Sequence, residues 1–175
     1  TFESDADILS VTLLKKKNDV FEPAHFWKNP GLQKLEGLSE SEFDAVRSAA
    51  TVSFEKVSAG ATELSSQVLP GGQPLLLVNL PFVQESPGNF SALLSIIVKQ
   101  ERLLESFSDS GVYTLALVDS EGRVLAHPDV TRVRDRENLA QLPIVRKMLA
   151  SKLEREFQEF KVGEIQYLGS YAKVG

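Results

Sequence analysis

The fold of this chain is decided by the stretch GVYTLALVDSEGRVLAH, residues 111–127. Its first part, Val112 to Asp119, is rich in β-branched and leucine residues, and Arg123 to His127 is a second run of the same kind, so both predict strands. Between them, the sequence Asp-Ser-Glu-Gly places Gly122 where a tight turn needs a left-handed backbone. We therefore expect a β-hairpin in which Gly122 has a positive φ angle.

The residues after this hairpin predict one helix and two further strands. Pro143 is well placed as the first residue of a helix that ends at Ala150, because proline is favoured at the first helical position. Glu156 to Lys161 and Ile165 to Val174 then have the composition of strands.

The N-terminal half predicts the same order of elements. Ile8 to Leu14 and Val20 to Trp27 are typical of strands, with Lys15 to Asp19 as a polar hairpin tip and Pro23 tolerable only at an edge or bulge. Ser39 and Glu42 form a capping box that begins a helix. The apolar face of this helix follows steps of three or four residues, and its members are Phe43, Val46, Ala50, Phe54 and Val57. Further segments predict three strands and a short helix: Ala61–Leu69, Leu75–Val83, Phe90–Val98 and Lys99–Phe107.

The two halves thus share the order strand, turn, strand, helix, strand, strand, and only the first half adds a fifth strand. Two strands, a helical connection and three strands is the order of a PAS-like antiparallel sheet with helices on one face. We expect an α+β fold with two tandem PAS-like lobes built on five-stranded antiparallel sheets. The first lobe would cover residues 5–107, and the second, residues 108–175, would be truncated before its last strand.

Composition excludes several classes of function. The chain is 42% hydrophobic, enough for a real core, and its net charge of -5 with no clustered basic face argues against nucleic-acid binding. It has no cysteine and two distant histidines, so we expect no thiolate chemistry, no metal site and no cofactor. Gly169-Ser170 lies in a strand pattern rather than a nucleophile elbow, and we expect no catalytic residues.

The ends of the sequence suggest a piece of a longer protein. No run of 18 or more apolar residues occurs, the first residue is Thr1 rather than methionine, and the last five residues continue a strand-like pattern.

The hairpin at residues 111–129 resembles the signature hairpin of Cache sensor domains, the PAS-like extracytoplasmic modules of chemoreceptors, sensor kinases and transmembrane cyclases. The resemblance continues through Asn138–Val145 and Tyr167–Ala172. Upstream, Gln73–Phe82 is similar to the strand that precedes the connection between the lobes of double Cache domains. The runs Leu142–Val145 and Leu168–Tyr171 look most like sensor regions of bacterial adenylate or guanylate cyclases.

The resemblance implies a periplasmic ligand-sensing domain of a bacterial receptor, homodimeric, anchored by flanking transmembrane helices and not itself an enzyme. Its output would be a cytoplasmic adenylate or guanylate cyclase. The alternatives are the sensor of a chemoreceptor or histidine kinase, or a dimerisation spacer that binds nothing. The family's amino-acid-binding subclass has an arginine four residues before a tryptophan; here Pro23 stands four residues before Trp27, so no amino-acid ligand is predicted.

Nine residues are candidate contacts for an unknown small-molecule ligand. Those in the first lobe are His25, Trp27, Asn79 and Phe82, and those in the second are Tyr113, His127, Arg146, Tyr167 and Ser170. The histidines also have structural interpretations: His127, at a strand end, could hydrogen-bond the following loop, and His25 could belong to an aromatic cluster on an edge strand.

Overall fold

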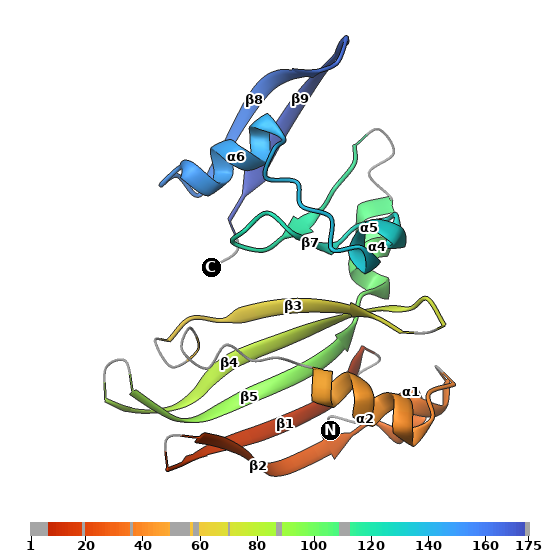
Figure 1. Cartoon of the computed structure of the whole chain (residues 1–175), viewed down its shortest axis with the longest axis vertical. Coiled ribbons are helices and arrows are strands. Elements are labelled where there is room, and N and C mark those ends of the chain that lie inside the picture. The colour runs from red at the N-terminus through yellow and green to blue at the C-terminus, as the bar shows by residue number, and fades with distance from the viewer. Residues whose placement is uncertain are drawn as a thin grey trace.

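Two hairpins joined by a central strand form the first sheet. The computed structural model describes residues 7–18, 20–35, 37–49, 57, 60–69, 71–86, 89–108 and 113–173. The strands are β1 (Ile8–Lys17), β2 (Val20–Lys28), β3 (Glu63–Val68), β4 (Pro74–Ser86) and β5 (Asn89–Lys99). They lie in the order β2-β1-β5-β4-β3, and every neighbouring pair is antiparallel (Figure 1). The expected α+β class and the PAS-like five-stranded sheet are confirmed for this part of the chain.

Pro23 and Pro81 lie at irregularities of the strand pairing, whereas Pro74 is the first residue of β4. Pro23 is in the edge strand β2, opposite a register shift between Leu13 and Leu14. Pro81 lies at a register shift in β4, so its missing N–H interrupts a ladder that is already irregular. The prediction that the lysine run forms the hairpin tip is wrong: Lys15 to Lys17 belongs to β1, and the turn begins at Asn18, which has a φ of 51°.

The helices α1 and α2 precede β3. In α2 (Glu40–Ala49) the capping box is present: the Ser39 N–H donates to Glu42 Oε2 at 2.9 Å, and the Glu42 N–H donates to Ser39 Oγ at 3.2 Å. A second helix, α1 (Pro30–Leu35), was not predicted; the side chain of Asn29 begins it by accepting the Leu32 N–H at 3.2 Å. The available signal was the asparagine followed by proline, since proline is favoured at the first position of a helix.

The predicted apolar face of the helix packs on the sheet. Phe43, Val46 and Leu32 form a buried cluster with Leu75, Leu77 and Ile97 of β4 and β5. Val57 is fully buried against Leu14 and Leu93, whereas Ala50 and Phe54 lie outside the described residues. One face of the sheet is therefore covered by helices.

The second half contains two separate hairpins. Its elements are α4 (Glu101–Ser108), β6 (Leu117–Val118), β7 (Val124–Ala126), α5 (Val130–Arg134), α6 (Pro143–Ala150), β8 (Arg155–Val162) and β9 (Ile165–Ala172). β6 pairs only with β7, and β8 pairs only with β9, among the strands described. α6 has the predicted bounds, but β6 covers only two residues of the strand predicted over Val112–Asp119.

A buried glutamine ties the second half to the first sheet. Gln100 follows β5 directly, and its Nε2 donates to Leu75 O of β4 at 3.0 Å and to Leu125 O of β7 at 2.8 Å. Beside it, Val68 of β3 packs against Val124 and Val133. The hairpin of β8 and β9 stands farther from the first sheet (Figure 1).

The hairpin turn that decided the fold has the predicted backbone. Gly122 has a φ of 82°, and a Cβ atom there would lie 3.0 Å from both the N and the Cβ of Ala140. The Leu139 N–H also donates to Gly122 O at 2.8 Å, which holds the two loops together. Glycine is thus required for its backbone angle and for the close approach of the loop.

We expect Gly122→Ala to destabilise the fold more than Gly163→Ala. Gly163 also has a positive φ, 61°, but no atom lies within 4 Å of the position that its Cβ would take, so its substitution costs only the left-handed backbone penalty, about 1 kcal/mol. Gly122→Ala adds the clash with Ala140 and should lower the melting temperature by several degrees more. Thermal unfolding of both variants measures this, and equal shifts would show that the Ala140 loop gives way freely.

Candidate functional site

A row of polar side chains crosses the helix-covered face of the first sheet. Directly paired residues of neighbouring strands point to the same face. Thr12 pairs with Ser95, and Ser95 pairs with Asn79. With Phe26 and Glu63 at its ends the full row is Phe26, Thr12, Ser95, Asn79 and Glu63, one residue from each strand.

The packing of β5 shows that this row lies on the covered face. Leu93 and Ile97 flank Ser95 at steps of two residues and therefore share its face. Leu93 packs against Val57, and Ile97 belongs to the cluster of Phe43. Phe26 also meets Phe43, with ring centroids 5.9 Å apart.

The opposite face of the sheet is apolar at the same level. The row on that face consists of Trp27, Val11, Ile96, Val78 and Leu64. The second half covers part of this face, because Val68, on the same side of β3 as Leu64, packs against Val124 and Val133. Apolar residues are therefore expected on this face, and the unusual feature of the sheet is the band of polar groups on its helix-covered face.

One polar side chain of the row, Asn79, and one near it on β1, Ser10, are buried without hydrogen-bond partners among the described residues. Asn79 is 1% exposed and Ser10 is 0% exposed, and Thr12 and Ser95 are also buried. Neither Nδ2 nor Oδ1 of Asn79 has a hydrogen-bond partner among the described residues, and neither has Oγ of Ser10. Leaving a buried polar group unpaired costs about 1–3 kcal/mol, so the Asn79 amide is a strong candidate to receive a ligand or a bound water.

The other candidates in the first half do not join Asn79. His25 and Trp27 stack on each other with centroids 5.6 Å apart, on the edge strand β2. Trp27 pairs with Val11 and therefore lies on the face opposite Asn79. Phe82, at 57% exposed, lies on β4 beyond the row.

His127 makes a hydrogen bond to the loop that follows it, as its structural interpretation predicts. It is buried at the end of β7, and its Nδ1 accepts the Asp129 N–H at 2.8 Å. Burial lowers the pKa of the imidazole, and the nearby positive charge of Arg132 lowers it further. The ring is therefore held neutral, with Nδ1 as an acceptor.

We expect His127 to make the fold less stable as the pH falls. The pKa of His127 is lowered in the folded state. Below the pKa of about 6.5 that the imidazole has in the unfolded chain, the unfolded chain therefore binds a proton more readily than the folded chain does. The free energy of unfolding should thus drop between about pH 7.5 and about pH 5.5. His127→Asn keeps an acceptor for Asp129 without titrating, and its chemical denaturation curves should change less over this range. Identical pH dependence in both chains would contradict this, with measurements near pH 8 as the common reference.

The remaining candidates of the second half are scattered over its surface. Tyr113 is 72% exposed, Arg146 lies exposed on α6, and Ser170 lies exposed on β9 opposite Phe157. Tyr167 stacks on Phe160 with centroids 5.7 Å apart. These residues do not converge on one site.

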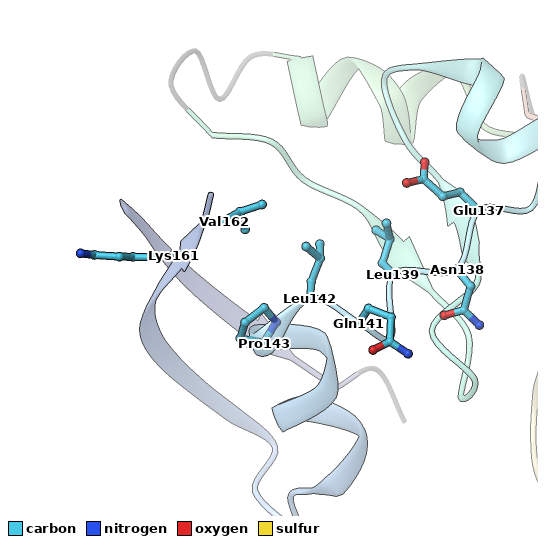
Figure 2. A pocket seen from close by; sticks show the side chains of 8 residues that line it. All are labelled: Glu137, Asn138, Leu139, Gln141, Leu142, Pro143, Lys161 and Val162. Carbon is cyan, nitrogen blue, oxygen red and sulfur yellow. The ribbon is translucent and has the colours of Figure 1, made fainter. Parts of the chain in front are cut away.

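A groove in the second half was not foreseen from the sequence. It has a volume of about 440 Å³ and lies between the loop before α6 and the end of β8. Figure 2 shows the side chains of Leu139 and Leu142 directed toward the groove. Val162, at the end of β8, lines the groove from the other side. The walls of the groove are completed by Glu137, Asn138, Gln141, Pro143 and Lys161.

The part of the chain that the structure describes holds neither a cluster of metal-ligating groups nor a membrane-spanning helix. There, no three acidic or histidine side chains gather closely enough to hold a metal ion. The helices of the same residues include none that is long and apolar enough to span a membrane.

Comparison with known proteins gives matches only among solved structures. No family model matches the chain, and no curated protein is similar to it in sequence. One similar structure is the ligand-binding domain of the amino-acid chemoreceptor PctC of Pseudomonas aeruginosa PAO1 in complex with GABA. Its identity is 19% and its TM-score 0.46, and the match covers 93% of this chain and 66% of that domain.

Another similar structure is the periplasmic domain of RsbU from Chlamydia trachomatis. Its identity is 14% and its TM-score 0.44, and the match covers 74% of this chain and 45% of that domain. The chain therefore spans just under two thirds of the first solved domain and less than half of the second.

Proposed function

We propose that this chain is the extracytoplasmic ligand-sensing region of a bacterial transmembrane receptor of the Cache type. The observation that carries the proposal is the buried amide of Asn79, which has no hydrogen-bond partner in the part of the chain that the structure describes and lies on the helix-covered face of a PAS-like sheet. A purely structural sheet gains nothing from an orphaned amide at this position, whereas a binding site needs one. The resemblance of residues 111–129 to the Cache hairpin supports the same proposal.

The chemistry of the row favours a small polar organic ligand. Ser10, Thr12 and Ser95 offer hydroxyl groups and Asn79 offers both a donor and an acceptor, so the centre of the site carries no charge. No arginine stands in the row to clamp a carboxylate, in agreement with the missing amino-acid motif. The rings of Phe26 and Phe43 supply an apolar end.

Signal would pass from this site along β5. Ser95 lies in the middle of β5, and Gln100 follows the strand and donates to Leu125 in the second half. A ligand that favours one position of β5 shifts the equilibrium between two arrangements of the halves, by no more than its difference in affinity for them. In this proposal residues 5–107 form the membrane-distal lobe and residues 108–175 an incomplete membrane-proximal lobe.

The rest of the receptor is inferred from the sequence resemblance. The domain would lie on the periplasmic side of the cell membrane, in a homodimer anchored by flanking transmembrane helices, and would have no enzymatic activity. The output we propose is a cytoplasmic adenylate or guanylate cyclase, because the runs Leu142–Val145 and Leu168–Tyr171 resemble the sensor regions of such cyclases. A chemoreceptor or a histidine kinase is the alternative output.

Asn79→Leu tests the site. Leucine has the same branched shape as asparagine, is larger, and replaces by methyl groups the two polar atoms that have no partner among the described residues. Because the space of a binding site beside the amide would take up the added volume, the free variant should be more stable, by about 1 kcal/mol. In wild type, a ligand present at about 100 times its Kd should add about 2.7 kcal/mol of stability. Thermal-shift measurement with a library of small polar metabolites should find such a compound, and the variant should lose the response.

Val78→Leu is the matched control, since it changes the adjacent side chain on the opposite face of β4. It should keep the full ligand response. A response that survives Asn79→Leu would place the ligand elsewhere, and a library with no stabilising compound would favour the spacer function instead.

A further inference from the structure

One face of the β8–β9 hairpin is exposed although it carries two large apolar side chains. Directly paired positions share a face, and this outer face includes Arg155, Phe157 and Glu159 of β8 with Leu168, Ser170 and Ala172 of β9. Phe157, at 73%, is the most exposed large apolar side chain among the described residues, and Leu168 is 69% exposed. Phe157 pairs with Ser170, two residues from Leu168, so the two apolar side chains are diagonal neighbours and form one patch.

The other face of the hairpin is covered by α6. A Cβ atom on Gly169 would lie 3.0 Å from Cβ of Ile144, and the ammonium group of Lys147 lies 2.6 Å from Glu156 Oε1. An antiparallel pair that is covered on one side normally carries polar residues on the other. The apolar patch on the outer face departs from this pattern, and exposed apolar patches mark surfaces that meet a partner.

The charges on the outer face have opposite signs on the two sides of Phe157. Arg155 lies two residues before it and Glu159 two residues after it, and both are exposed. Successive residues of one face are about 6.7 Å apart, so the two charges are at equal distances from the ring. A two-fold axis through Phe157, perpendicular to the strand, therefore places Arg155 of each copy opposite Glu159 of the other.

A different axis would not bury the aromatic ring. Lys161 follows Glu159 on the same face, and an axis between these two residues would also bring opposite charges together. Phe157 would then lie opposite the turn at Gly163 of the second copy and remain in water. Only the axis through Phe157 both buries the ring and pairs the charges.

We propose that the outer face of the β8–β9 hairpin is the contact between two copies of this chain, packed face to face across a two-fold axis through Phe157. The two rings fill the centre of the gap of about 10 Å between packed sheets, and an Arg155–Glu159 pair flanks them on each side. On β9, Leu168 of each copy lies opposite Ala172 of the other. Packed sheets cross at about 30°, which displaces positions this close to the axis by only about 3.5 Å.

The contact gives a surface to the homodimer of the proposed receptor, and to that extent it rests on the proposed function. The face is smaller than the roughly 20–30 residues that each partner contributes to a standard interface, so the free chain should associate weakly, with a Kd of about 10⁻⁵ to 10⁻³ M. Two copies anchored in one membrane have a high effective concentration, and a weak contact then suffices. The ligand site at Asn79 takes no part in it.

Reversal of single charges tests the two-fold pairing. Arg155→Glu and Glu159→Arg should each weaken self-association by about tenfold or more, because both pairs across the axis then carry like charges. An equimolar mixture of the two variants should associate about as well as wild type, since the acidic positions of one face the basic positions of the other. Sedimentation equilibrium at low salt, from about 10 µM to about 1 mM protein, measures both effects.

Phe157→Ser tests the centre of the contact, and Ile165→Ser is its matched control. Ile165 is also exposed, at 59%, in the same hairpin, but it pairs with Val162 and lies on the face that α6 covers. Both substitutions remove an exposed apolar side chain, so both should change the melting temperature little. Only Phe157→Ser should weaken association, by about tenfold or more.

The proposal is overturned if the wild-type chain stays monomeric up to about 1 mM, or if the mixture of charge variants associates as weakly as each variant alone. It is also overturned if Ile165→Ser weakens association as much as Phe157→Ser. A monomeric chain that still responds to a ligand through Asn79 would overturn this contact and leave the proposed ligand site intact. Intact association without any ligand response would overturn the ligand site alone.

Discussion

The pairing of β5 with both β1 and β4 is the constraint on which the rest of the molecule depends. β1 and β5 are far apart in the sequence, and only their pairing brings Thr12 beside Ser95. The pairing of β5 with β4 places Ser95 beside Asn79. Gln100 follows the same strand directly, and its two hydrogen bonds hold the second half against the first sheet. The candidate site and the connection to the second half thus share one element.

The distribution of polarity across this sheet points to function rather than stability. Asn79 and Ser10 are buried with no partner for their polar atoms among the described side chains and backbone, which costs free energy that leucine or alanine would not cost. Aliphatic residues such as Val78 and Ile96 occupy the opposite face. Natural sequences depart from consistent patterning mainly at functional sites, where a partner supplies the missing interactions. The polar row fits that description better than any other set of described side chains.

Local signals in the sequence predicted much of the fold. The capping box at Ser39, the proline start of α6 and the glycine of the Asp119–Gly122 turn each act within a few residues, so they could be found without a structure. The row around Asn79 could not, because it depends on the register between distant strands. Asn79 itself was a candidate, but Thr12 and Ser95 were missed; the available signal was a single polar residue at an inward position of an otherwise apolar strand. The length of β6 was mispredicted because strand length is set by neighbouring strands as well as by composition.

The central claim is that the Asn79 amide is a ligand contact, and the side-chain NH₂ signals of Asn79 in ¹⁵N–¹H NMR test it most directly. These signals can be assigned by their loss in Asn79→Leu. In the free chain they should report an amide without a protein partner, and a stabilising compound should shift them together with the backbone signals of Ser95 and Thr12. A compound that binds tightly, shifts signals elsewhere and leaves those of Asn79 unchanged would contradict the account.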